Sequence, residues 1–273
     1  MTSQDTTLHI YIISDSIGET ALNVVRATIA QFPNVNSVLH KFTFVSTSTR
    51  LQPILDQAYK DQAILYLTIA DPELAKATEK FCQNRNLTYF NLMQPMVDAI
   101  YNKTGHTPSQ IVGAQHELSD EYFSRINAME FTIKYDDGKD PKGFQEADII
   151  LLGISRTSKT PLSMYLSTLG FKVANLPLIS ENEPPQILFE IDRKKIVGLT
   201  NDLNVVQKFR NNRMIEYGLS ANTQYASSER ITKELQFADT LYKKLGVPVL
   251  NVAERSIEES AHIIINILNY NIK

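Results

Sequence analysis

Short apolar runs alternate with helical segments along most of this chain, and this alternation constrains the fold more than any other feature of the sequence. The first run, residues 8–13, is rich in β-branched side chains and is followed by a turn and a helical segment at 21–27. Strands that alternate with helices are typical of a parallel sheet covered on both faces, which binds ligands at the carboxyl ends of its strands. We therefore expect an α/β fold. Further strands are predicted near 37–45, 63–69, 87–92, 148–152, 171–175, 195–199 and 247–252, and further helices at 50–60, from 71 onward, and at 121–131, 161–169, 203–211, 229–245 and 257–270.

One strand-to-helix turn has the spacing of a phosphate-binding loop. Residues 153–160 read Gly-Ile-Ser-Arg-Thr-Ser-Lys-Thr, close to the pattern G-x-x-x-x-G-K-[ST] in the context that this pattern requires. Backbone amides and the positive end of a helix attract anions there, while Lys159 can reach terminal phosphates and Thr160 can ligate Mg²⁺. We predict a solvent-facing, catalytic Lys159, with Thr160 as metal ligand. The predicted nucleotide-binding residues are Gly153, Ile154, Ser155, Arg156, Thr157, Ser158, Lys159 and Thr160.

The loop departs from the pattern at one position, because Ser158 stands where the second glycine is usual. A side chain there is strained if the residue must take a positive φ. An alternative interpretation is an ordinary turn capped by Ser155, Thr157 or Ser158, which needs no ligand. Arg156 favours the anion site, since a second cation in a positively polarised turn is unfavourable without an anion. The planar guanidinium of this arginine also matches the geometry of phosphate oxygens.

Turn-forming clusters at 104–108 and 136–143 interrupt the alternation of strands and helices in the middle of the chain. We expect two domains, an N-terminal parallel-sheet α/β domain at 1–139 and a P-loop-kinase-like α/β domain at 140–273. A chain of 273 residues buries roughly 70–75% of the surface that its unfolded form exposes, so it can fold without a disulfide, metal or partner.

Several carboxylates are further candidates for the site. Asp202, just after the strand 195–199, is the favoured catalytic carboxylate of a kinase, with Asp192 second. Asp136 and Asp137 precede a glycine and indicate first a loop, with a paired-carboxylate site as the alternative. Asp15 lies in a turn that lacks lysine, so it is expected to cap that turn or else to bind a hydroxyl, a basic group or a metal.

Composition excludes several classes of function. The 27 lysines and arginines against 30 acidic residues give a net charge of -3. No segment concentrates enough basic residues to follow a nucleic-acid backbone, so nucleic-acid binding is not expected. The single cysteine, Cys82, cannot form an internal disulfide, which favours the reducing cytoplasm. No apolar run approaches the ~20 residues of a membrane helix, so no membrane association is expected.

The five histidines are predicted to be structural, because they show neither metal-ligand spacing nor a neighbouring nucleophile. A zinc hydrolase is therefore not supported. His116 is the one that we single out as a substrate contact. The histidines are His9, His40, His106, His116 and His262.

Seven segments spread over nearly the whole chain form a familiar set, and they are 13–21, 122–131, 136–138, 153–163, 173–178, 197–200 and 256–261. Through these segments the chain resembles the bacterial pyruvate, phosphate dikinase regulatory protein family. Ser158 before Lys159 is typical of the branch that acts on the dikinase, whereas the sister branch acting on phosphoenolpyruvate synthase more often has glycine there.

The resemblance implies a bifunctional regulator of pyruvate, phosphate dikinase. Such enzymes phosphorylate a target threonine with ADP as donor, yielding AMP, and reverse this with inorganic phosphate, releasing pyrophosphate. Residues 153–160 would be the ADP-binding loop, and Mg²⁺ is expected from the chemistry. Three alternatives stay open: the same reaction on phosphoenolpyruvate synthase, a P-loop kinase of a small metabolite, and a non-catalytic nucleotide-sensing module. The oligomeric state is also open, a homodimer included.

Overall fold

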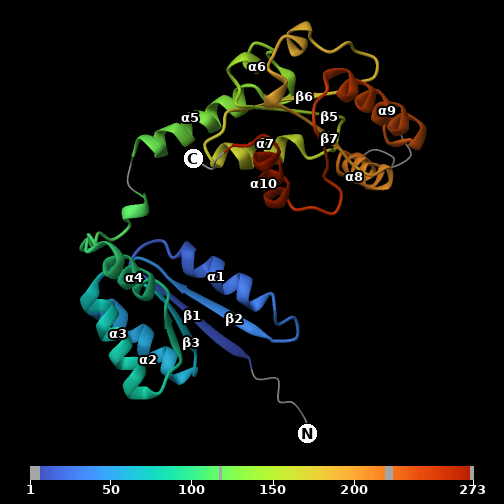
Figure 1. Cartoon of the computed structure of the whole chain (residues 1–273). Helices are drawn as coiled ribbons and strands as arrows, with labels where there is room; N and C mark the ends of the chain where they lie inside the picture. The colour runs from blue at the N-terminus through green and yellow to red at the C-terminus, as the bar shows by residue number, and fades with distance from the viewer. Residues whose placement is uncertain (1–6, 117–118, 219–223, 271–273) are drawn as a thin grey trace. The chain divides into compact units, whose positions relative to one another are not determined.

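The computed structural model describes residues 7–116, 119–218 and 224–270 (Figure 1). The chain forms two compact units, Met1–Glu117 and Leu118–Lys273. The division falls earlier than the expected boundary after residue 139, because helix α5 (Asp120–Lys134) packs with the second unit. In that helix Phe131 joins the core of the second unit, and Thr132 Oγ1 accepts a hydrogen bond from the backbone N–H of Val173 at 3.1 Å.

Unit 1 contains a four-stranded sheet in the order β2-β1-β3-β4, with every neighbouring pair parallel. Its first strand runs in the middle of the sheet, so the chain fills positions on one side of it and then on the other. The elements are β1 (Leu8–Ser14), α1 (Glu19–Ile29), β2 (Ser37–Phe42), α2 (Ser48–Lys60), β3 (Ile64–Thr68), α3 (Pro72–Arg85), β4 (Tyr89–Asn91) and α4 (Gln94–Thr104), followed by a 3-10 turn at Ala114–His116.

The two faces of β1 bury different helices, as the two-residue period of a strand requires. Ile10 and Ile12 pack with Val25 of α1, whereas Tyr11 and Ile13 belong to the core that α2 and α3 cover. Because both faces are apolar, β1 reads as a continuous hydrophobic run, which is typical of a parallel sheet.

Unit 2 repeats this strand order as β6-β5-β7-β8, again with parallel pairs only. All five residues of its central strand β5 are buried. The elements are α5, α6 (Gly143–Glu146), β5 (Ile149–Gly153), α7 (Lys159–Thr168), β6 (Val173–Pro177), β7 (Ile196–Thr200), α8 (Leu203–Glu216), α9 (Ser228–Leu245), β8 (Val249–Asn251) and α10 (Ile257–Ile267), with 3-10 turns at Asp136–Gly138, Gln186–Phe189, Arg193–Lys195 and Gln224–Ala226.

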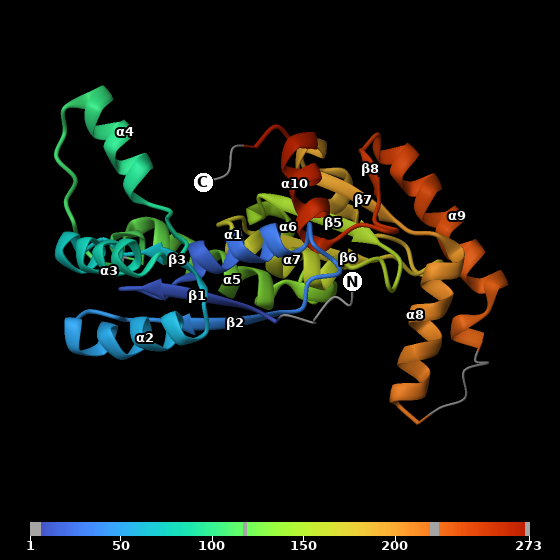
Figure 2. The same cartoon turned by 90° about the horizontal axis from the view of Figure 1, so that it is seen from below.

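The helices of unit 2 cover both faces of its sheet. Ile149 and Leu151 pack with α7 and α10, whereas Ile150 and Leu152 face a core that includes α8 and α9. Helices α8 and α9 lie side by side (Figure 2). The carboxyl end of β5 therefore opens between layers of helices, and this end positions the loop that follows.

The expected α/β class is confirmed, and the predicted strands and helices form within a few residues of their expected limits. Helix α4 is the largest element that sequence reasoning missed. None of its residues is buried, and its apolar side chains Met96, Ile100 and Tyr101 are exposed. Within the described residues, no helix combines the length and apolar character that crossing a bilayer requires.

Candidate functional site

The loop between β5 and α7 lies at the carboxyl end of the central strand of unit 2. The strands on either side of β5 are reached in opposite directions, so this loop stands at the topological switch point where parallel α/β sheets bind ligands. Two of its residues are left-handed, Arg156 at φ 73° and Ser158 at φ 58°. Ser158 is the N-cap of α7, and no cap hydrogen bond forms from its side chain.

Gly153 is required by close packing. A Cβ at this position would lie 2.4 Å from Thr157 Oγ1 and 3.2 Å from the carbonyl oxygen of Leu199. Thr157 is fully buried, and its hydroxyl donates to the carbonyl of Ile154 at 2.9 Å. The first glycine of the pattern thus lets the loop fold back tightly against strand β7.

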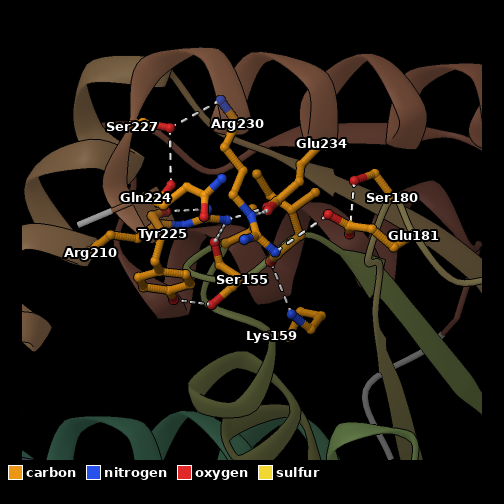
Figure 3. Close-up of polar contacts among 12 residues, drawn as sticks. Ser155, Lys159, Ser180, Glu181, Arg210, Gln224, Tyr225, Ser227, Arg230 and Glu234 are labelled. Atoms are coloured by element: carbon orange, nitrogen blue, oxygen red, sulfur yellow. Dashed lines mark hydrogen bonds and ion pairs between the residues drawn. The ribbon is translucent and has the colours of Figure 1, made fainter.

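Lys159 is buried and not solvent-facing as the sequence suggested, with 6% of its surface exposed. Its Nζ donates to the carbonyl oxygen of Ile154 at 3.0 Å, which folds the side chain back over the loop (Figure 3). Burial lowers its pKa to about 8, although the carboxylates of Asp137 and Asp136 raise it. Arg210 and Arg156 also lower this pKa, with smaller effects than those of the two carboxylates.

Asp136 contacts the loop directly. Thr160 Oγ1 donates to Asp136 Oδ1 at 2.9 Å, and Asn175 Nδ2 donates to the same oxygen at 2.6 Å. The backbone N–H of Asp137 also bonds to Asn175, at 3.2 Å to its Oδ1. The Asp-Asp-Gly segment is a turn, as expected, and the structure also brings its carboxylates to the predicted phosphate loop.

A cavity of about 940 Å³ opens over the loop. This volume lies within the range of small-molecule and cofactor sites. Its lining combines four cations, three carboxylates and an apolar wall. The cations are Arg156, Lys159, Arg213 and Arg230, the carboxylates are Asp136, Asp137 and Glu234, and the wall includes Pro177, Leu178, Ile179 and Phe209.

One donor of the loop lacks a partner. Among the described residues, no hydrogen-bond acceptor reaches the buried Nε of Arg156. A buried unpaired donor costs free energy, so it marks a position where an acceptor would stabilise the protein. Phosphate oxygens are such acceptors.

A buried ion pair contacts the loop (Figure 3). Arg210 on α8 is fully buried and pairs with Glu234 on α9. The same guanidinium donates to the carbonyl of Tyr225 at 2.9 Å and to that of Ser155 at 3.3 Å. The hydroxyls of Tyr225 and Ser155 lie 2.6 Å apart, and Arg230 Nε donates to Glu234 Oε1 at 3.0 Å.

Sequence reasoning missed Arg210 and Glu234, although a signal was present. Arg210 follows Val206 by four residues and shares its buried helix face, while Glu234 lies on the face of α9 that carries Ile231 and Ala238. A charged residue on each of two apolar stripes indicates a buried pair.

Two other sequence candidates have different surroundings. Asp202 is the N-cap of α8, is exposed, and accepts from Asn251 Nδ2 at 3.1 Å. It is not among the described residues that line the cavity. Asp192 caps a 3-10 turn, where its side chain accepts from the N–H of Lys194 at 3.0 Å.

In unit 1 the corresponding turn after β1 is acidic. Asp15 Oδ2 accepts from the backbone N–H groups of Ala70 at 2.6 Å and Asp71 at 3.0 Å. Gly18, at φ 71°, is the N-cap of α1. Asp15 therefore does not cap its own turn as expected, and its contacts instead brace the turn between β3 and α3. The side chain of His116, singled out as a substrate contact, lies outside the described part of the chain.

The family profile and the curated relatives that match this chain point to the same kind of protein. The sequence profile of the kinase/pyrophosphorylase family matches residues 10–265. A protein of Enterococcus faecalis is 50% identical over 260 residues, 95% of this chain and 94% of its own length, and one of Lacticaseibacillus casei is 45% identical over 258 residues, 94% of each chain. Both have the provisional name pyruvate, phosphate dikinase regulatory protein. A solved LacI transcriptional regulator from Lactobacillus brevis aligns with a TM-score of only 0.18 at 10% identity, too low to indicate a shared fold.

Proposed function

The chain belongs to the kinase/pyrophosphorylase family, and from this premise we propose that it switches pyruvate, phosphate dikinase off and on by reversible phosphorylation. The donor for phosphorylation of a target threonine is ADP, and the acceptor for its removal is inorganic phosphate. Relatives that are 45–50% identical over nearly their full length have the name of regulators of that dikinase, which supports the choice of target.

The observation that carries the proposal is the loop 153–160 with its cavity. A left-handed turn, a helix N-terminus and a buried lysine converge there with the unpaired Nε of Arg156. Backbone amides at a helix start, together with fixed cations, form an anion site without further arrangement. A cavity of about 940 Å³ accommodates a ligand of nucleotide size.

Both directions can use one geometry. In the forward direction the threonine oxygen attacks the β-phosphorus of ADP, a new P–O bond forms, the bond to the bridging oxygen breaks and AMP leaves. In the reverse direction an oxygen of inorganic phosphate attacks the phosphothreonine phosphorus, and pyrophosphate and the free hydroxyl are the products. Charge on the moving phosphoryl group is the same in both cases, so Lys159 and Arg156 stabilise either transition state.

The hydroxyl proton needs an acceptor, and we assign this role to Asp137. Its neighbour Asp136 is already engaged by Thr160 and Asn175, whereas the side chain of Asp137 is exposed in the cavity lining. Asp202, the sequence candidate for this role, is engaged with Asn251 instead.

The residues around Thr160 fit Mg²⁺. The hydroxyl of Thr160 and the carboxylate of Asp136 lie together, and hard oxygen donors are what Mg²⁺ prefers. These two side chains would hold the ion, which when bound neutralises phosphate charge.

The test uses purified dikinase, the full-length protein and ADP labelled on the β-phosphate. We expect label on one dikinase threonine with one AMP formed per phosphate transferred, and release of pyrophosphate when inorganic phosphate replaces ADP. Phosphoenolpyruvate synthase in place of the dikinase measures target choice. Labelling of a small metabolite only, or ADP binding without transfer, would overturn the proposal in favour of a metabolite kinase or a sensing module.

A further inference from the structure

Two histidines that are distant in sequence lie together in unit 1. His9 is on β1 and His40 is on the neighbouring strand β2. His9 Nδ1 and His40 Nε2 are 3.1 Å apart, and the two rings are stacked with centroids 5.4 Å apart. The strand register makes this possible, because His40 pairs with Tyr11, which the two-residue period places on the same face as His9.

A carboxylate completes the group. Asp61 is the C-cap of α2, and one of its oxygens and one nitrogen of each histidine all lie within 4.8 Å of one another. All three residues are half-buried. We propose that His9, His40 and Asp61 form a Zn²⁺ site that ties the end of α2 to strands β1 and β2.

The donor set suits zinc. Two imidazoles and one carboxylate, with a water in the fourth position, are a common set of zinc ligands. Ligands about 2.0–2.1 Å from a tetrahedral ion are roughly 3.4 Å from one another. The two ring nitrogens already lie close to this spacing, and an oxygen of Asp61 lies within 4.8 Å of both.

The surroundings hold the carboxylate in place. Tyr11 Oη donates to Asp61 Oδ2 at 2.6 Å, and Gln57 Nε2 donates to Oδ1 at 2.9 Å. Partners of this kind orient metal ligands in known sites. The group also lies at the carboxyl end of α2, where the helix dipole favours a cation.

This site is independent of the nucleotide loop, which belongs to unit 2. Its ligands belong to three elements of unit 1, and no reaction step uses them. The expected consequence is structural, since an ion that binds only the folded state stabilises it by RT ln(1 + c/Kd), which grows with the free ion concentration c.

The first experiment is a Co²⁺ titration of the full-length protein after treatment with a chelator. We expect visible absorption bands of four-coordinate Co²⁺ that saturate at one equivalent, disappear when Zn²⁺ is added, and accompany a rise in the melting temperature. His9→Gln and His40→Gln should each weaken Zn²⁺ binding by more than the roughly 10–100-fold that loss of a supporting partner costs. The matched control is His262→Gln, on an exposed histidine of α10 whose Nδ1 bonds to the carbonyl of Glu258 in its own helix.

X-ray absorption at the zinc edge of the wild-type complex makes the test independent of whether a variant folds. Two imidazoles and no sulfur around the ion support the site. Absence of stoichiometric binding, binding that survives both His9→Gln and His40→Gln, or a sulfur ligand would overturn it.

Discussion

The two units share one strand order, yet the turns after their first strands contain side chains of opposite charge. In unit 1 the turn after β1 contains Asp15, which accepts two backbone N–H groups of the neighbouring loop. In unit 2 the turn after β5 contains Arg156 and Lys159, and its donors include one without a partner. The same topology therefore produces a self-satisfied turn in one unit and a turn with an unpaired buried donor in the other.

The ion pairs near these two turns differ in how deeply they are buried. Arg210 and Glu234 are buried beside the second turn, whereas Lys41 and Glu19 pair on the surface beside the first, with 30% and 50% of their side chains exposed. Removal of one partner of a buried pair strongly lowers the stability of the protein, whereas an exposed pair contributes little to it.

The largest expected effect follows from this contrast. Arg210→Ala leaves the Glu234 carboxylate buried without its main partner, so unit 2 should lose about 3–5 kcal/mol of stability. Hydrogen exchange of peptides from α8 and α9, read by mass spectrometry, measures this loss in unit 2, and peptides from α1 report on unit 1. Glu19→Gln is the matched control and should change the exchange of unit 1 by less than about 1 kcal/mol. Equal effects of the two substitutions would contradict the comparison.

Lys159→Ala should lower both phosphorylation and phosphorolysis by on the order of 100-fold or more, because the lysine charge stabilises the transferring group. The fold should persist, since the carbonyl of Ile154 keeps its bond from Thr157 Oγ1 at 2.9 Å. Rates of AMP and pyrophosphate formation measure the effect. Lys41→Ala removes a lysine beside the other turn and should leave both rates unchanged. Phosphorolysis that persists in Lys159→Ala would contradict a shared site.

Asp15→Ala tests the self-satisfied turn. The N–H groups of Ala70 and Asp71 lose their acceptor, and each unpaired group costs about 1–3 kcal/mol if water does not reach it. We expect faster hydrogen exchange in α3 and β3 with unchanged nucleotide affinity, measured by calorimetry. A loss of affinity without a loss of protection would instead make Asp15 a ligand-binding residue.

The pKa of Lys159 predicts two opposite pH trends. Because burial lowers this pKa to about 8, the charge is lost as pH rises through 8, and affinity for ADP should fall up to tenfold per pH unit above it. Stability changes the other way. The unfolded chain binds more protons than the folded one between pH 8 and the ordinary value of 10.5, so this group makes unit 2 more stable as pH rises through that window.

The difference between wild type and Lys159→Met isolates the lysine from other groups that titrate in the same range. Calorimetry and urea unfolding at several pH values measure the two trends. A flat difference between the proteins from pH 7 to pH 9.5 would contradict the role of burial.

The smallest effects concern the two left-handed caps. Ser158 takes φ 58° where Gly18 of the other turn takes φ 71°. Ser158→Gly should relieve strain of about 1 kcal/mol and keep or improve ADP binding, whereas Gly18→Ser should cost unit 1 a similar amount. Calorimetry at fixed Mg²⁺ checks the first and thermal unfolding checks the second. Weaker binding by Ser158→Gly would show that the serine hydroxyl itself contacts phosphate.

The features that follow from neighbours in the chain were predictable. The alternation of apolar runs and helices predicted two parallel sheets, and Asp71 before Pro72 predicted the start of α3, where its side chain accepts from two backbone N–H groups. The spacing of residues 153–160 predicted a turn at the carboxyl end of a strand. The position of Ser158 also indicated a residue that would be strained in a glycine conformation. Hydrophobic period, helix capping and turn chemistry are local, so they are readable without a structure.

Only the tertiary structure decided which distant side chains meet. Asp136 bonds to Thr160, 24 residues away, because the turn after α5 packs beside β6. His9 reaches His40, 31 residues away, through the register of two strands. Burial likewise turned Lys159 from an expected surface lysine into one with a lowered pKa. These contacts depend on strand order, register and desolvation, which are properties of the whole packed chain and not of any segment of its sequence.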